Sequence, residues 1–410
     1  MYHRLRVGLL VVFCLSIGNL FGLFAQHSTD YYSLSMVGNA GNGIFAPYYL
    51  SANKHGLVTH SKSGYLRASV FKGLEMNKRF SYEFGIDLVG LMSSTSPVSY
   101  YSDGNLKTYN PGVSSFLIQQ AYIGMKYRMI FISAGCRELT DEVVNFELSS
   151  GGLVWSGNAR PIPQVRAGFI DFVDIPFTKG WVQIKGELAY GKFMDNDFLR
   201  DHYNYYNQYI TTDALYHHKS ISFRSNPDKP FVVTIGAELA AQFGGTKRYY
   251  EKGILIDSLT MKSPTRLKDF FKILFPSSGD GHTNEGDQAY YYGNHVGQWN
   301  LSAEYRFKDN SSVRGYFEWY FDDASGMGKF NGWDGLWGLE YKSGKKNWPS
   351  NVVLEYLDMT NQSGPLNWCP SDYNDPKLDI EATGADDYYN NYFYNGWAHY
   401  GLSNGTAMAK

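Results

Sequence analysis

The chain has 410 residues, with 37 Lys and Arg against 39 Asp and Glu, and a formal net charge of −2. This balance argues against a nucleic-acid-binding protein, which needs a concentrated basic face. Aromatic residues make up 17% of the chain, including 34 Tyr, and there are 43 Gly. Abundant Tyr and Gly favour many twisted strands and turns over helices, so we expect an all-β protein.

The N-terminus has the pattern of a secretory signal peptide over residues 1–25. Two arginines precede an apolar run over 7–24, and the small Ala25 marks the border with the polar chain. A retained membrane anchor is the alternative. No later apolar run reaches 18 residues, so we expect no membrane-spanning helix. Cys136 and Cys369, which follow the signal, could pair in an oxidising compartment.

Apolar and polar residues alternate in many segments of about ten residues, as in strands with one face in lipid and the other in a lumen. The alternation is clearest at 80–89, 182–190, 231–243 and 298–308, and weaker at 117–127, 313–321, 336–341, 351–358 and 392–402. A soluble β-sandwich alternates too, but commonly with shorter strands. Aromatic residues also recur near the strand ends, where the girdles of membrane barrels lie: Phe80, Trp181, Phe231, Phe243, Trp299 and Phe321. We therefore predict a transmembrane antiparallel β-barrel of the outer-membrane type.

The predicted strands are joined by connections of two kinds, short polar turns and long loops. Residues 308–312 form a short turn between two strands, whereas the stretches near 194–230, 244–297 and 359–390 are long and polar. Loops of that length are usually functional. We expect residues 26–60 to lead into one barrel over 61–410, without a second domain.

The segment near 137–169 is too rich in Gly and Pro to be a plain strand. Irregular backbone is tolerated at membrane depth only where protein or a wet cavity surrounds it, so we expect a lumen or plug segment. One interpretation is a structural plug whose charges neutralise one another in the lumen: Arg137, Glu138, Glu147, Arg160 and Arg166. The other places these charges and Trp155 beside a sugar path.

No phosphate-binding loop, zinc-protease helix or nucleophile elbow is present in the sequence, and we expect no enzyme activity, cofactor or metal. His217 and His218 are adjacent, and we expect them in a solvated loop, because neighbours in extended chain point in opposite directions. The groups at 280–287 and 372–375 contain oxygen ligands suited to calcium but lack the EF-hand spacing. We expect hydrated loops at both.

Six stretches of the sequence resemble parts of a known protein family. They are Arg137-Glu138, Leu148–Gly152, Asn158–Pro163, Ile175–Trp181, Pro47–Gly56 and Tyr392–Gly401. Together they resemble the capsule assembly Wzi family. The resemblance implies an outer-membrane barrel of roughly eighteen antiparallel strands. It also implies a lectin-like, non-enzymatic role in attaching or organising capsular polysaccharide on the bacterial cell surface.

The last residues depart from this resemblance. Outer-membrane barrels tend to finish on a strand with a terminal aromatic residue, but residues 401–410 are not amphipathic and do not end on an aromatic residue. We expect this chain to lack closing strands. An unclosed sheet in lipid would expose unsatisfied backbone groups at several kcal/mol each.

Sugars have apolar C–H faces and many hydroxyls, which suit aromatic rings beside polar side chains. The candidate carbohydrate-binding residues are Trp155, Tyr205, Tyr206, Tyr291, Trp368 and Tyr389. Each could equally be part of a solvated outer loop. The leading hypothesis is a capsule-associated lectin whose partners are exported polysaccharide and outer-membrane lipid. An outer-membrane porin or transport channel is the alternative, and an outer-membrane enzyme would need clustered catalytic groups.

Overall fold

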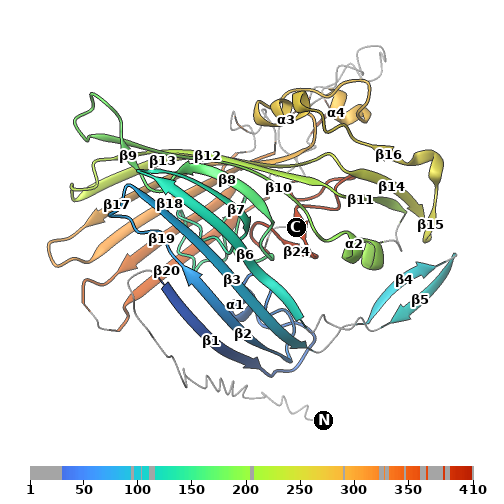
Figure 1. Ribbon diagram of the computed structural model, residues 1–410, viewed down its shortest axis with the longest axis horizontal. Helices are drawn as coiled ribbons and strands as arrows, with labels where there is room; N and C mark the ends of the chain where they lie inside the picture. The colour runs from blue at the N-terminus through green and yellow to red at the C-terminus, as the bar shows by residue number, and fades with distance from the viewer. Residues whose placement is uncertain are drawn as a thin grey trace, which may run out of the picture.

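The computed structural model describes residues 30–93, 97–102, 104–109, 116–203, 207–289, 291–322, 327, 332–345, 348–360, 366–367, 382–383 and 388–408. A 14-stranded antiparallel sheet forms the body of the protein and curves around the segments that fill it (Figure 1). Among the described residues, no helix is long and apolar enough to cross a membrane.

The large sheet is a meander, in which nearly every strand pairs with the next one along the chain. Its order is β1-β2-β3-β6-β7-β8-β10-β12-β13-β17-β18-β19-β20, and β9 also pairs with β10. The strands are β1 (Asp30–Asn39), β2 (Ser63–Lys72), β3 (Phe80–Ser93), β6 (Phe116–Tyr127), β7 (Ile130–Cys136), β8 (Gln164–Phe169), β9 (Val173–Asp174), β10 (Val182–Lys192), β12 (Leu215–Ser225), β13 (Phe231–Phe243), β17 (Asn294–Arg306), β18 (Ser312–Phe321), β19 (Gly335–Lys342) and β20 (Asn351–Asp358). This is the connectivity of an up-and-down barrel.

The remaining elements belong to the connections. A small sheet contains β11 (Gln208–Thr212), β14 (Thr246–Glu251), β15 (Ile254–Leu255) and β16 (Met261–Lys262). Three pairs of short strands are β4 (Val98–Ser102) with β5 (Asn105–Tyr109), β21 (Leu366–Asn367) with β22 (Ala382–Thr383), and β23 (Ala398–His399) with β24 (Leu402–Ser403). The helices are α1 (Tyr48–Ser51), α2 (Asn196–Tyr203), the 3-10 turn η1 (Asp257–Leu259), α3 (Leu267–Leu274) and α4 (Glu285–Ala289).

The two ends of the sheet differ, as an outer-membrane barrel requires. At one end, short connections such as 128–129, 226–230 and 307–311 join consecutive strands. At the other end, long connections such as 137–163 and 244–293 hold most of the helices and the small sheet. We call these the turn end and the loop end.

The large sheet has an apolar outer face and a polar inner face, the reverse of a water-soluble protein. Ile86, Leu354 and Tyr356 point outward with exposed fractions of 52%, 70% and 63%. Asp87 and Glu318 point inward and are 0% exposed. Alternation therefore places apolar side chains where lipid would lie and ionisable ones inside.

Aromatic residues mark both rims of the outer face. At the loop end, Phe317 stacks on Trp337 with ring centroids 3.9 Å apart, and Trp319 stacks on Trp333 at 5.4 Å. At the turn end, exposed rings include Phe80, Trp181, Phe231, Tyr305, Phe307 and Trp348. The exposed Phe80, Trp181 and Phe231 confirm the predicted girdle at the turn end. Phe243 and Phe321, predicted for the other rim, are 0% and 2% exposed and so are not part of an exposed girdle.

Most predicted strands are confirmed with small shifts at their ends, and 231–243 and 351–358 match β13 and β20. The prediction at 392–402 is wrong, because that stretch forms turns and the short β23–β24 pair.

Two other parts of the predicted plan differ from the structure. The long polar loop expected near 194–230 contains β12, and residues 26–60, expected only to lead into the barrel, contain β1. In β12, His217 and Lys219 lie on outward positions, so its alternation is weak in the sequence. In β1, the outward Tyr32, Leu34 and Met36 alternate with the inward Ser33 and Ser35 over only a short stretch.

Candidate ligand site in the filled lumen

Two segments far apart in the sequence occupy the lumen and brace each other. The connection 137–163 follows β7, and Leu153 and Val154 within it are 0% exposed. Against it lies the segment 388–408, whose Trp397 Nε1 donates a hydrogen bond to the Val154 carbonyl oxygen at 2.7 Å. We refer to 137–163 as the plug and to 388–408 as the bracing segment.

Inward side chains of the wall satisfy the backbone of the plug. Glu318 accepts a hydrogen bond from the Leu153 amide at 2.8 Å, and Gln298 accepts one from the Val154 amide at 3.0 Å. Glu355 accepts another from a plug amide at 2.9 Å. Irregular backbone inside a barrel requires such partners, because an unsatisfied buried amide is costly. The buried wall carboxylates therefore hold the plug in place.

The plug charges do not neutralise one another as predicted; they pair with the wall. Arg137 Nη1 lies 2.8 Å from Glu83 Oε1 on β3. Glu138 Oε2 lies 2.7 Å from Arg67 Nη2 on β2. The plug lies against the inner face of the sheet, which carries buried charged side chains. These wall charges need partners of opposite sign, and the plug supplies them.

The other three predicted plug charges have different surroundings. Arg166 lies on β8 and forms an ion pair with Glu187 of β10, so it belongs to the wall. The Arg160 guanidinium lies over the Tyr400 ring of the bracing segment, 4.5 Å from its centroid. Glu147 is exposed. The five residues therefore form no single cluster.

A pocket of about 500 Å³ lies between the plug and the inner faces of β1, β2 and β6. This volume is in the usual range for small-molecule sites. We call it the lumen pocket. Its lining combines aromatic rings with cationic, anionic and amide groups, including Tyr31, Tyr65, Phe71, Tyr122, Phe146, Arg67, Arg137, Glu138 and Gln120.

Hydrogen bonds fix the polar groups of the lumen pocket. Arg67 also forms an ion pair with Asp87, which accepts a hydrogen bond from Ser69 Oγ at 2.9 Å. Gln120 Nε2 donates to Asp87 at 3.2 Å, and Gln120 Oε1 accepts from the Glu138 amide at 2.9 Å. Side chains held in this way need little reordering when a ligand binds, which favours affinity.

The connection between β1 and β2 forms another side of the lumen pocket. The His55 ring stacks on Phe146 of the plug, with centroids 5.5 Å apart. Burial lowers the pKa of His55, although the carboxylate of Glu138 opposes this shift. His55 is therefore neutral near pH 7 and adds an aromatic, uncharged surface to the pocket.

One plug carboxyl group has an unusual environment. Asp141 accepts hydrogen bonds from the Val143 amide at 2.6 Å and the Val144 amide at 3.3 Å. Burial, together with the nearby carboxylate of Glu238, raises the pKa of Asp141 to about 7. The folded protein therefore favours the protonated form of Asp141.

None of the predicted sugar-binding residues that the structure describes lines the lumen pocket. Trp155 is half-buried in the plug, and Tyr291 is half-buried beside His295, with ring centroids 6.3 Å apart. Tyr389 is 6% exposed and its hydroxyl donates to the Leu153 carbonyl oxygen, so its prediction as a sugar contact is wrong. Its ring is used to pack the bracing segment against the plug. Tyr205, Tyr206 and Trp368 lie outside the described residues.

The sequence interpretation missed the rings that line the lumen pocket. Tyr65 and Tyr122 occupy inward positions of β2 and β6, and Tyr31 occupies one of β1. The available signal was an aromatic residue at an inward position of an otherwise polar row.

A second aromatic group lies at the loop end. Tyr209 of β11 packs against Tyr249 of β14 at 5.1 Å and against Tyr392 at 5.4 Å between ring centroids. Tyr392 is 63% exposed. We call this the loop-end aromatic group, and it is a surface on which a sugar ring could stack.

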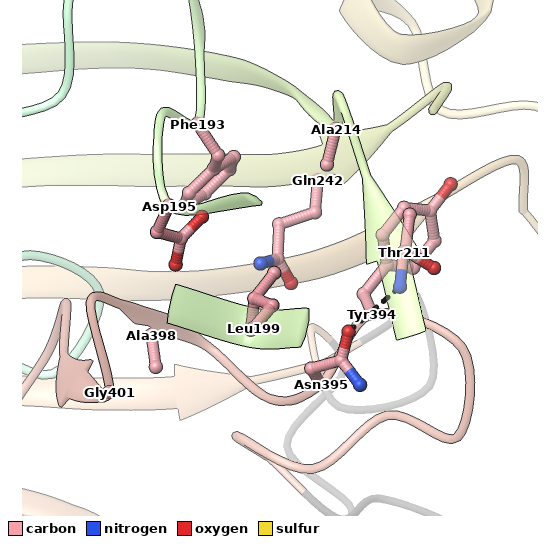
Figure 2. Close-up of a pocket in the computed structure, with 10 residues that line it drawn as sticks. All are labelled: Phe193, Asp195, Leu199, Thr211, Ala214, Gln242, Tyr394, Asn395, Ala398 and Gly401. Carbon is pink, nitrogen blue, oxygen red and sulfur yellow. Dashed lines mark hydrogen bonds between the residues drawn. The ribbon is translucent and has the colours of Figure 1, made fainter. Parts of the chain in front are cut away.

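The crevice in Figure 2 lies where α2 and β11 meet the bracing segment, and it is too small for a sugar. Its volume of about 10 Å³ is close to the space of one water molecule. Asn395 Oδ1 accepts a hydrogen bond from the Thr211 amide at 3.0 Å across it, shown dashed in Figure 2. The contact joins the bracing segment to the small sheet.

The two adjacent histidines lie in a strand, not in the solvated loop we predicted. His217 and His218 are in β12 and point to opposite faces of the sheet. His217 is 0% exposed on the outer side, and His218 lies 2.7 Å from Glu238 in the lumen. The strand was missed because a polar residue on an outward position hides the alternation.

Neither candidate calcium group is assembled in the described part of the chain, where no three His, Cys, Asp or Glu side chains form a metal-binding group. Asp280 instead pairs with Arg266 at 2.8 Å and Lys268 at 2.9 Å. The group at 372–375 lies outside the described residues. Cys136 has a free thiol that donates to the Pro161 carbonyl oxygen at 3.2 Å, and Cys369 lies outside the described residues.

These features define the class of protein: an antiparallel β-barrel of the outer-membrane type whose described lumen is filled by a plug and a bracing segment. No family model matches the chain, and no curated protein matches it.

Several solved structures are similar to this chain at low identity. One is Wzi, described as an outer-membrane protein involved in group 1 capsule assembly in Escherichia coli and as a carbohydrate-binding β-barrel. Its identity is 13% and its TM-score 0.47, over 93% of this chain and 64% of that one. A mutant of the Rh. blastica porin has 11% identity and a TM-score of 0.27, over 79% of this chain and 98% of that one. The outer-membrane channel DcaP of Acinetobacter baumannii has 11% identity and a TM-score of 0.29, over 82% and 92%.

This chain therefore spans less than two thirds of the length of Wzi. At TM-scores below 0.5, these likenesses say nothing about what this chain binds.

Proposed function

We propose that this chain belongs to the bacterial outer membrane, where it binds a polysaccharide at the cell surface in a lectin-like manner. The observation that carries the proposal is the lumen pocket, in which aromatic rings and fixed hydrogen-bonding groups lie together. Aromatic faces suit the C–H surfaces of a sugar, and the arginine, carboxylate and amide groups suit its hydroxyls. The role that follows is attachment or organisation of capsular polysaccharide.

The outer face supports the membrane placement. Apolar residues cover it between two aromatic bands, and the charged residues lie inside. Outer-membrane barrels keep short turns in the periplasm and long loops outside, so the loop end would face the medium. Separation of inner and outer membranes, followed by detection of the chain in each fraction, tests this placement.

The filled lumen favours binding over diffusion. Leu153, Val154 and Trp397 occupy the space that a porin leaves to water, with exposed fractions of 0%, 0% and 1%. A channel with this plug in place would conduct poorly. Planar-bilayer recordings at neutral pH test the difference, and stable open currents of porin size would favour the channel alternative.

The decisive experiment measures binding of purified full-length protein to the capsular polysaccharide of its own organism and to an unrelated polysaccharide. We expect specific binding that Tyr65→Ala and Tyr122→Ala each weaken about tenfold, the loss of one good aromatic contact. Tyr392→Ala is the matched control, because it removes an exposed ring from the loop-end aromatic group.

The outcomes separate two sites. Loss of binding only in Tyr392→Ala would move the site to the loop-end aromatic group. Equal binding of related and unrelated polysaccharides, or no binding by well-folded protein, would contradict the lectin-like role. We expect binding without turnover, and shortening of the polysaccharide during incubation would indicate an enzyme.

A further inference from the structure

Helix α3 lies beside α4 at the loop end (Figure 1) and packs against the outer face of the sheet. Ile273 is 0% exposed and packs with Phe243 and Tyr292, and Phe270 joins the same cluster. Phe243 occupies an outward position of β13. One side of α3 thus continues the apolar outer surface of the barrel.

The opposite side of α3 is also apolar and is exposed. Leu267, Phe271 and Phe275 have exposed fractions of 76%, 56% and 69%. Leu267 and Phe271 lie one turn apart on the same side of α3, and Phe275 follows directly after its last residue, so the three form one apolar stripe. In water this stripe would be unfavourable, whereas an amphipathic helix at a membrane interface buries such residues among lipid.

A groove of about 430 Å³ lies beside α3 on the same outer wall. Residues of the four neighbouring strands β12, β13, β17 and β18 line it, including Ile221, Ala237 and Leu239, and Pro276 lies just after α3. The groove is therefore mostly apolar and continuous with the lipid-facing surface. Its shape and chemistry suit a hydrocarbon chain.

Lys219 places a cation in this mostly apolar groove, whose lining also includes Glu238, His295 and Asp322. Its Nζ donates to the carbonyl oxygens of Ile273 and Leu274 at the C-terminal end of α3. An ammonium group has three N–H donors, and only two go to these carbonyls. An anionic or ester oxygen of a lipid in the groove would be the matching acceptor.

More cations lie along the same helix. Arg266, Lys268 and Lys272 gather near Asp280, and Asp269 also pairs with Arg266. Three cations against two carboxylates leave one net positive charge (3 − 2 = +1) beside the exposed apolar stripe. Positive charge at the edge of a membrane attracts anionic headgroups.

We propose that this groove is a specific site for a lipopolysaccharide molecule of the outer leaflet, with one acyl chain in the groove and a headgroup phosphate near the cations of α3. The inference rests on the proposed membrane placement with the loop end outward, since lipopolysaccharide occupies that leaflet. It does not depend on the lumen pocket, which lies on the other face of the wall.

The test uses full-length protein extracted from outer membranes in mild detergent. Native mass spectrometry counts bound lipid before and after addition of lipopolysaccharide or phosphatidylglycerol. We expect about one retained lipopolysaccharide per chain. Ala237→Trp fills the groove and should lower its occupancy at least tenfold, and Lys219→Met should lower it severalfold.

Ala303→Trp is the matched control, because Ala303 is an outward residue of β17 outside the groove. It should retain the lipid. Equal loss in both tryptophan variants, no loss in either, or equal retention of phosphatidylglycerol would overturn the proposal. Heat-modifiable gel mobility verifies that each variant is folded, and polysaccharide binding measured on the same samples reports separately on the proposed function.

Discussion

The two sides of the lumen have the same kind of polar inner wall, but the inward side chains have different partners. Along β1 to β6, inward polar residues such as Arg67 and Asp87 pair with one another around an unfilled pocket. Along β17 to β20, inward residues such as Glu318 accept hydrogen bonds from the plug, and the space is packed. Buried charges on a barrel wall therefore do not by themselves indicate a ligand site. What distinguishes the two sides is whether the chain itself supplies the partners.

The largest expected loss of stability comes from removing a buried ring on the packed side of the lumen. Trp397 is 1% exposed and joins the bracing segment to the plug. Trp397→Ala should lower the free energy of unfolding by about 3–5 kcal/mol, because it removes a large buried ring and leaves a cavity. Thermal unfolding followed by gel mobility measures this loss.

The same variant sharpens the comparison of the two sides. A loosened plug should admit ions, so planar-bilayer conductance should rise. Unchanged stability together with unchanged conductance would show that the bracing segment does not hold the plug.

Removing one charged side chain from the wall of the lumen pocket should reduce stability less. Arg67→Met leaves Asp87 and Glu138 without their cation, and the Arg67 side chain is only 20% exposed. We expect a loss of about 2–3 kcal/mol in unfolding free energy, because buried carboxylates lose a charged hydrogen-bonding partner. Urea unfolding measures it, and Arg306→Met, at the turn end, is the control with an expected change near zero.

A pH experiment probes the plug between the two sides. Burial raises the pKa of Asp141 from 3.8 to about 7, so the folded state holds the proton more tightly than the unfolded chain. The resulting stabilisation is fully present below about pH 4 and is lost as the pH rises to about 7. Asp141→Asn keeps the acceptor oxygen and cannot ionise.

We therefore expect the melting temperature of the parent protein to fall by a few degrees more than that of Asp141→Asn between pH 5 and pH 8. Differential scanning fluorimetry across this range measures both curves. Parallel curves would show that Asp141 does not titrate inside the plug.

The smallest expected effect is at the edge of the polar network. Ser69 Oγ donates to Asp87 in the pocket wall at 2.9 Å. Ser69→Ala should lower the free energy of unfolding by about 1 kcal/mol, the usual contribution of one such hydrogen bond. It should weaken polysaccharide binding only slightly. Isothermal titration calorimetry compares the two proteins, and a loss as large as that of Tyr65→Ala would mean that Asp87 contacts the ligand directly.

The alternation of residues determined the membrane strands. β13 and β20 match their predicted ranges because a strand with one face in lipid repeats every second residue, which is a local property of the chain. The sequence did not predict β12, because the polar His217 lies on its outer face. There it is buried against the Tyr190 ring of β10. The aromatic residues at the turn end, such as Phe80 and Phe231, were likewise visible in the sequence.

Tertiary structure alone decided which residues meet. The stretch 392–402 has the alternation of a strand, but Trp397 is buried against the plug and the segment fills the lumen. Tyr389 looked like an exposed loop residue and instead anchors the same packing. The lumen pocket depends on contacts between residues far apart in the sequence, such as Asn53 with Phe146, which are 93 positions apart. Local periodicity cannot encode such contacts, because they arise only when the sheet curves and the plug enters it.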